Sequence, residues 1–142
     1  MSDICLNLVT CMVVPEGLRP LDRIWSLEHW QKSLSRVQRV VQKKSSEEYQ
    51  RFELVFDAGL LTPDFVEVER YRREKEIEVI HLVPPPGIKE LSAKWWVESQ
   101  NQNRIFARRK VIIDESEYTP AKARKMFRIL RENMEFLMRS DT

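Results

Sequence analysis

Apolar residues recur with the period of an α-helix in two long segments of the chain. In residues 22–44 they are spaced three or four apart and fall within about 80° on a helical wheel. Asp22, just after Pro20, is suited to cap the start of a helix. A second run, opened by Thr119–Pro120, keeps its apolar residues on one side of the wheel as far as Arg139. We therefore expect two long amphipathic helices, 22–44 and 119–139. Their apolar positions are Leu27, Trp30, Leu34, Val37 and Val41 in the first, and Ala123, Met126, Phe127, Leu130, Met134, Leu137 and Met138 in the second.

Between these helices the pattern changes to the alternation and branched side chains of strands. Residues 51–56 place Phe52, Leu54 and Phe56 on one face, and residues 65–71 and 77–83 are further candidates. The charged stretch 72–76 predicts a hairpin turn, with Arg70 and Arg72 facing Glu76 and Glu78 across it. An alternative makes Thr62–Pro63–Asp64 the start of a helix, so that 62–76 is either helix or hairpin.

A proline-rich turn at residues 84–87 precedes the next elements. Residues 88–94 suggest a short helix, and 93–99 and 104–113 suggest two strands joined by the polar loop 100–103. A single helix over 88–103 is the alternative.

The apolar run from Ile4 to Val14 predicts a buried strand at the N-terminus. Together the elements predict the α+β class: an antiparallel sheet of about five strands flanked by the two long helices. We expect residues 1–142 to form one globular domain.

The composition suits a folded domain, because 42% of the 142 residues are hydrophobic and 32% are charged. Cys5 and Cys11 lie in the N-terminal run, and we expect buried free thiols in a reducing compartment, the cytoplasm. Since no apolar run reaches the roughly 20 residues that cross a bilayer, no membrane partner is expected.

Motifs of catalysis and cofactor binding are missing from the sequence. It has no Gly-rich phosphate loop and no Gly-x-Ser-x-Gly, and its two histidines have no metal-ligand spacing. We expect His81 to be buried and hydrogen-bonded, and His29 to face solvent. Asp57, Asp64 and Glu67 leave a metal-dependent hydrolase as a third hypothesis, although the acidic-x-Lys partner is lacking. The sequence thus predicts a protein that is not an enzyme, with no catalytic residue, no cofactor, no metal and no small-molecule substrate.

Two surfaces remain as candidates for binding. Trp95 and Trp96 would point to opposite faces of a strand, and Ile129 and Phe136 form a separate ridge on the last helix. These four residues favour a non-enzymatic protein–protein interaction subunit or adaptor of a larger intracellular assembly, through self-association or a protein partner.

The alternative function is binding to a nucleic-acid backbone through basic faces of the first helix and of the strand at 104–113. An exposed tryptophan would stack on a base. The residues of this candidate surface are Trp25, Lys32, Arg36, Arg39, Lys43, Arg108, Arg109 and Lys110.

Overall fold

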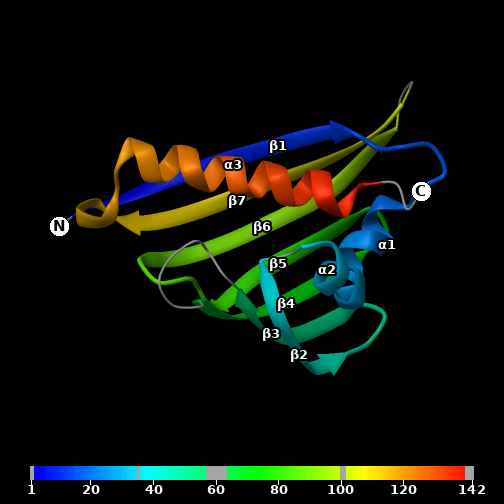
Figure 1. Cartoon of the computed structure of the whole chain (residues 1–142), viewed down its shortest axis with the longest axis horizontal. Coiled ribbons are helices and arrows are strands. Elements are labelled where there is room, and N and C mark those ends of the chain that lie inside the picture. Colours follow the sequence, from blue (N-terminus) through cyan, green and yellow to red (C-terminus); the bar gives the residue numbers. More distant parts are fainter. Residues whose placement is uncertain (1, 35, 57–63, 100–101, 140–142) are drawn as a thin grey trace.

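The computed structural model describes residues 2–34, 36–56, 64–99 and 102–139. Its centre is a sheet of seven antiparallel strands in the order β1-β7-β6-β5-β4-β3-β2 (Figure 1). Every neighbour along the chain from β2 to β7 is also a neighbour in the sheet, and β1 pairs with β7. The strands are β1 (Asp3–Val13), β2 (Val37–Ser45), β3 (Tyr49–Phe56), β4 (Asp64–Arg73), β5 (Glu76–Val83), β6 (Ile88–Ser99) and β7 (Asn103–Asp114).

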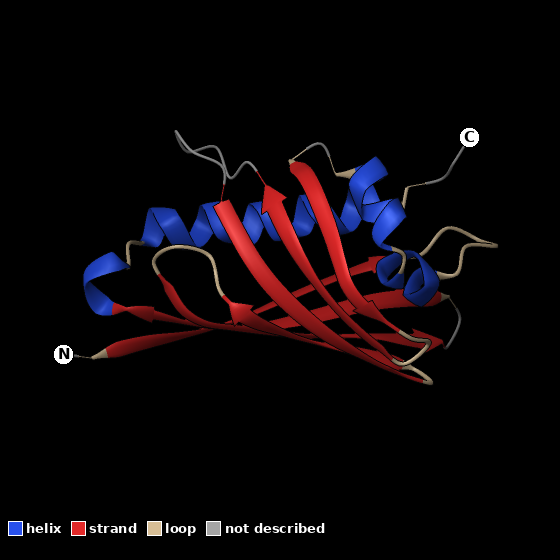
Figure 2. Ribbon diagram, turned by 90° about the horizontal axis from the view of Figure 1, so that it is seen from below, coloured by secondary structure: helices blue, strands red, loops and turns tan. Residues whose placement is uncertain are grey.

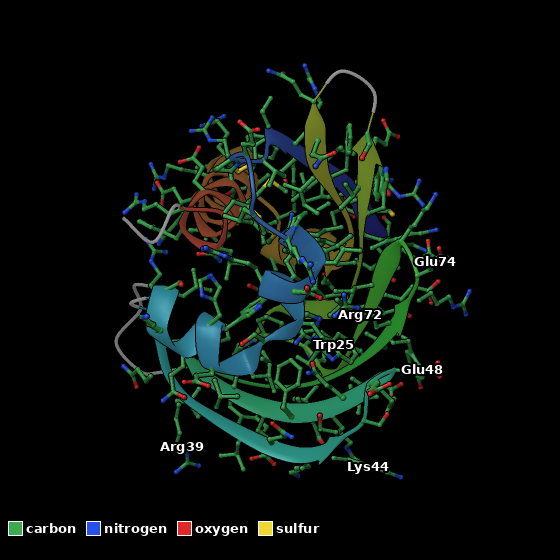
Figure 3. The ribbon with its side chains drawn as sticks, turned by 90° about the vertical axis from the view of Figure 1, so that its right-hand side faces the viewer. Trp25, Arg39, Lys44, Glu48, Arg72 and Glu74 are labelled. Atoms are coloured by element: carbon green, nitrogen blue, oxygen red, sulfur yellow. The ribbon has the colours of Figure 1, made fainter. Side chains whose placement is uncertain are left out.

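The sheet is strongly curved, and the helices lie on its concave side (Figure 2). Helix α3 (Pro120–Leu137) runs along β1 and β7, preceded by the 3-10 turn η1 (Glu115–Glu117). Two short helices, α1 (Pro20–Trp25) and α2 (Leu27–Ser33), lie within the curve at one end of the sheet (Figure 3). The α+β class is therefore confirmed, but the sheet has seven strands instead of about five, and only one of its helices is long.

The predicted helix 22–44 is wrong over its second half. Ser26 ends α1, and its side chain accepts a hydrogen bond from the backbone N–H of His29 (3.2 Å), which starts α2. Helix α2 ends at Ser33, and residues from Val37 onward pair with β3 as an edge strand. Branched valines suit a strand, and their spacing only coincides with a helical period.

The hairpin interpretation of the middle of the chain is confirmed. Strands β4 and β5 pair with Arg73 opposite Glu76, so Arg72 faces Ile77 and not a glutamate. The short helix predicted at 88–94 is wrong, because that segment belongs to β6 and pairs with β7. Gly87 has a positive φ of 84° and closes the proline-rich turn before β6. The alternative helix start at Thr62–Pro63 lies outside the described residues.

Helix α3 agrees with the sequence pattern. The Thr119 hydroxyl accepts from the backbone N–H of Lys122 (3.1 Å), and Pro120 takes the first helical position. Its last turn is buried through Met134, Leu137 and Met138, in one core with residues of α1, α2 and the strands. Within the described residues, no helix is long and apolar enough to cross a membrane.

The N-terminal strand is an edge strand of which only alternate residues are covered. Cys5 and Cys11 are free thiols, but both are exposed, so the expectation of buried cysteines is wrong. Period-two alternation places odd-numbered residues of β1 on the outer face, while Thr10 on the inner face is buried.

Candidate functional site

The concave face of the sheet is apolar except at a few positions. In β7 the side chains of Ile105, Ala107, Val111 and Ile113 are buried on this face, and Arg109 shares their phase. The buried polar or charged residues among those described are Thr10, Gln50, Arg70 and Arg109. Two of the four are arginines, and buried arginines need compensation by a partner.

Arg70 on β4 has such compensation from the protein. Its guanidinium donates to the backbone carbonyls of Ile24 (2.6 Å) and Trp25 (2.9 Å) and, through Nε, to Gln50 Oε1 (3.0 Å). Gln50 in turn donates to the Trp25 carbonyl at 2.9 Å. Arg70 thereby binds the C-terminal end of α1, where the helix dipole favours a positive charge. Three aromatic rings lie 5.0–5.5 Å from its guanidinium carbon: Trp25, Trp30 and Phe52.

Arg109 on β7 is nearly as buried but has far fewer partners. Its Nη1 donates to the hydroxyl of Thr10 at 3.1 Å, and its guanidinium carbon lies 4.8 Å from the centre of the Trp95 ring. Among the described residues no carboxylate forms an ion pair with it, and burial lowers its pKa to about 10. The fold thus satisfies Arg70, whereas the described residues give the Arg109 guanidinium one hydrogen-bond acceptor, the Thr10 hydroxyl.

The neighbours of Arg109 in the sheet are small or apolar. Ala93 lies opposite it on β6, and Leu8 lies opposite it on β1. The adjacent row across the sheet runs from Thr10 through Ala107 to Trp95. Ala93 and Leu8 face the interior and yet remain partly accessible, so the protein does not completely fill the space beside the guanidinium.

His81 extends this polar region along β5. It shares the inward phase of Ile77 and Val79, and its Nδ1 atom is buried without a hydrogen-bond partner. Burial lowers its pKa to about 4; a backbone contact with Leu91 opposes this shift, and the charge of Arg109 adds to it. The imidazole is therefore neutral at physiological pH. The expected hydrogen bond of His81 is made with the backbone of Leu91, whereas Nδ1 has no partner among the described residues. We call Thr10, His81, Trp95 and Arg109 together the Arg109 site.

Helix α3 covers the concave face unevenly. Met134 and Leu137 in its last turns are fully buried, whereas Phe127 and Leu130, on the same side of the helix, remain partly exposed. The C-terminal end is fixed by other contacts: Arg23 Nη1 donates to the carbonyl of Arg139 (2.6 Å), and a ring nitrogen of His29 lies 2.9 Å from the carbonyl of Leu137. The solvent-facing position expected for His29 is thus wrong. The helix packs tightly at its end and more loosely before it.

Two hollows also lie on the surface near α1. One, of about 360 Å³, includes Arg19, Asp22 and His29; the other, of about 500 Å³, lies between α1 and the turns that join β2 to β3 and β4 to β5. The larger hollow is lined by Trp25, Glu47, Glu48, Arg72, Arg73 and Glu74, of which Trp25, Glu48, Arg72 and Glu74 are labelled in Figure 3. It mixes acidic and basic groups, and Arg72 already pairs with Asp22 at 2.5 Å.

The residues predicted to form a protein interface do not share one surface. Trp95 is only 2% exposed and lies against Arg109 in the interior. Trp96 points to the outer face, as alternation requires, and stacks on Phe106 with ring centres 5.3 Å apart. Phe136 packs against the core and under the guanidinium of Arg139, and Ile129 is partly buried on α3.

The residues predicted to bind nucleic acid are also separated. Arg39 points outward from β2 (Figure 3), and Lys43 on the same strand pairs with Glu53 at 2.5 Å. On β7 the basic run is divided between faces, with Arg108 and Lys110 exposed and Arg109 inside. Three residues complete the set: Lys32 is exposed on α2, Arg36 is partly buried with Nη1 unpaired, and Trp25 is partly buried against the core.

The hypothesis of a metal-dependent hydrolase gains no support from the part of the chain that is described. Glu67 forms ion pairs with Arg51 (2.7 Å) and Lys43 (3.6 Å) on the outer face of the sheet. Asp57 lies outside the described residues. No group of three acidic, His or Cys side chains with the geometry of a metal site occurs among the described residues.

A curved antiparallel sheet of seven strands with a C-terminal helix on its concave side is the START/Bet v1-like fold. A START superfamily protein from Mycobacterium smegmatis has 6% identity to the chain and a TM-score of 0.71, with 94% of each chain covered. No protein-family model matches the chain, and no curated protein sequence matches it.

Two further solved structures with this fold are aromatase/cyclases. The di-domain aromatase/cyclase StfQ of the steffimycin biosynthetic pathway has 15% identity and a TM-score of 0.79, over 94% of this chain and 48% of StfQ. The Zhui aromatase/cyclase from Streptomyces sp. R1128 has 13% identity and a TM-score of 0.70, over 96% and 88%. The chain thus spans about half the length of StfQ. At these identities the likeness establishes the fold.

These structures correct the functional interpretation of the sequence. The chain has the fold of aromatase/cyclases, and this contradicts the predictions of a non-enzymatic adaptor and of a nucleic-acid-binding protein. It also contradicts the expectations that the protein is not an enzyme and has no small-molecule substrate. The sequence did carry one overlooked signal. Arg109 stands in phase with Ala107 and Val111 in an alternating strand, which places it inside, but its basic neighbours suggested a surface patch.

Proposed function

We propose that the chain binds a small, largely apolar molecule between the concave face of its sheet and helix α3. The observation that carries this proposal is the Arg109 site, where polar groups with unused hydrogen-bonding capacity stand in an apolar interior. Buried polar groups are nearly always satisfied in proteins, and unsatisfied ones cluster at sites that receive a ligand. The resemblance to aromatase/cyclases, which act on small molecules, supports the same function.

The partial exposure of Ala93 suggests a direct test of this proposal. The Ala93→Trp variant fills the space beside Arg109, whereas Ser92→Trp places the same side chain on the outer face of β6. Titration with the neutral fluorescent probe N-phenyl-1-naphthylamine should show saturable binding to the wild type and to the Ser92 variant, and at least tenfold weaker binding to the Ala93 variant. Circular dichroism checks that both variants are folded. Equal binding by all three proteins would place the probe elsewhere and refute the proposal.

A second candidate function is acid–base catalysis within the same site. His81 is neutral at physiological pH, and its free Nδ1 can accept a proton, while the charge of Arg109 lies close enough to affect its pKa. In such a reaction His81 would remove a proton next to a carbonyl group of the ligand, and the charge of Arg109 would stabilise the negative charge that develops on the oxygen.

Hydrogen–deuterium exchange can test this second function without knowledge of the natural substrate. The methyl protons next to the carbonyl of 2-acetonaphthone exchange slowly in D₂O, and NMR follows their loss. We expect the wild-type protein to accelerate the exchange and the His81→Gln variant to lose the acceleration. A rate equal to that in buffer for the wild type, under conditions in which the ketone is bound, would reject catalysis while leaving ligand binding intact.

A further inference from the structure

The two buried arginines differ in what the protein gives them. Arg70 makes hydrogen bonds with two backbone carbonyls and Gln50, and it shows how this fold satisfies a purely structural arginine. Arg109 is 5% exposed and donates to one neutral hydroxyl, that of Thr10. A guanidinium has five N–H donors. The two guanidinium groups lie in the same sheet and differ in the number of acceptors around them. We take this difference as a sign that the Arg109 site binds a ligand.

The residues around Arg109 occupy some sides of its guanidinium and leave others open. The Trp95 ring lies 4.8 Å from the guanidinium carbon and occupies one side of the group, and Thr10 holds one of its terminal nitrogens. The neighbouring Ala93 on β6 is too small to cover the rest. The free donors therefore lie on the concave face of the sheet, next to the partly accessible Ala93 and Leu8, and a carboxylate-like group can accept two of them at once.

Charge balance indicates which ligand chemistry fits. A buried cation without a counter-charge is costly, and among the described residues no acidic side chain neutralises Arg109. A neutral ligand would leave this cost in place, whereas an anionic oxygen would remove it. The rest of the lining is apolar, with Val79, Val111 and Ile113 buried on the same face. The ligand thus needs an acidic oxygen group at one point and an apolar body elsewhere.

We propose that the ligand of the interior is an aromatic or aliphatic molecule with one anionic oxygen group, which Arg109 binds while Thr10 and Trp95 hold the guanidinium in place. This inference rests on the proposed binding function and narrows it to one ligand class. A carboxylate, an enolate and a phenolate share the required chemistry.

A matched pair of probes tests the inference separately from the proposed function. 2-Naphthoate and 2-naphthamide have the same shape and differ in charge. Calorimetric titration should show that the wild type binds the naphthoate more tightly by about ten- to hundredfold, the usual range for a hydrogen bond to a charged group. The Arg109→Met variant should bind both probes with similar affinity. Arg108→Met, which removes the neighbouring arginine on the outer face of β7, should keep the preference.

The possible outcomes separate the charge preference of the site from its binding function. Equal affinity of the wild type for both probes, or an intact preference in Arg109→Met, would overturn the inference and leave the binding function standing. If neither naphthalene probe binds, the inference fails, and the titration with N-phenyl-1-naphthylamine decides separately whether the binding function stands. Arg109→Gln provides a second variant should the methionine variant not fold, and the same loss of preference is expected for it.

Discussion

Nη1 of Arg109 and Oγ1 of Thr10 are 3.1 Å apart, and this neutral hydroxyl is the only hydrogen-bond acceptor that the described residues give the buried guanidinium. The contact joins the two strands at one edge of the sheet, β1 and β7, on the face covered by α3. A charge held inside by a hydroxyl and an indole ring is oriented but not neutralised. That combination makes Arg109 costly for folding and useful for binding.

Replacement of Arg109 by methionine should stabilise the protein. Burial lowers the pKa of Arg109 to about 10, and one neutral hydroxyl is the only acceptor that the described residues give its charge, so the charged side chain destabilises the fold at neutral pH. Because methionine fills a similar volume without charge, we expect a gain of about 1–3 kcal/mol. Urea denaturation of wild type, Arg109→Met and the outer-face control Arg108→Met measures it. A loss of stability in Arg109→Met alone would show that the arginine has a structural partner.

The opposite result is expected for Arg70→Met. That change leaves Gln50 Oε1 without its donor and removes one of the two side-chain donors to each of the carbonyls of Ile24 and Trp25, at a cost of about 3 kcal/mol or more. The neighbouring Arg72→Met removes only an exposed pair with Asp22 and should cost less than about 1 kcal/mol. Thermal unfolding compares the two variants. Similar losses in both would contradict the role assigned to Arg70.

The pH dependence of stability should carry the signature of His81. Its pKa in the folded protein is about 4, below the ordinary 6.5, so the unfolded chain takes up the proton first as pH falls. The contribution of the neutral imidazole to the free energy of unfolding is therefore full above about pH 6.5 and is lost progressively as the pH falls toward 4. At pH 5 the loss should be about 2 kcal/mol relative to pH 7.5. Denaturant titrations at pH 7.5 and pH 5 measure the free energy of unfolding of the wild type and of His81→Gln. The decrease between the two pH values should be smaller in the variant by this amount. An unchanged difference in the variant would mean that His81 titrates normally.

The end of α3 should depend on α1 and α2. Arg23 donates to the carbonyl of Arg139, and His29 lies at hydrogen-bond distance from that of Leu137. We expect Arg23→Met to lower stability by about 1–2 kcal/mol and to speed hydrogen exchange in the last turn of α3, because the final carbonyls lose a cationic partner. Arg128→Met, on the exposed side of α3, is the control and should change neither. Uniformly faster exchange along all of α3 would instead indicate that the whole helix is released.

The sequence by itself determined the elements whose signals are local. Alternation in 51–56 marked a strand because successive side chains of a strand point to opposite faces, and branched side chains marked another in 77–83. Thr119–Pro120 marked the start of α3 because a cap and a first-turn proline act within one turn. The opposite orientations of Trp95 and Trp96 followed from the same alternation.

The tertiary structure decided what depends on distant partners. The segment from Val37 is a strand because β3 offers it an edge, although its apolar spacing suits a helix equally well. Arg109 became part of an interior site because α3 covers the concave face of the sheet, on which Arg109 lies, and leaves Arg108 and Lys110 on the other face of β7. The sequence of a run of three basic residues does not show whether the middle side chain lies in the interior or on the surface. Only the packing of segments a hundred residues apart, such as Thr10 and Arg109, separates the two cases.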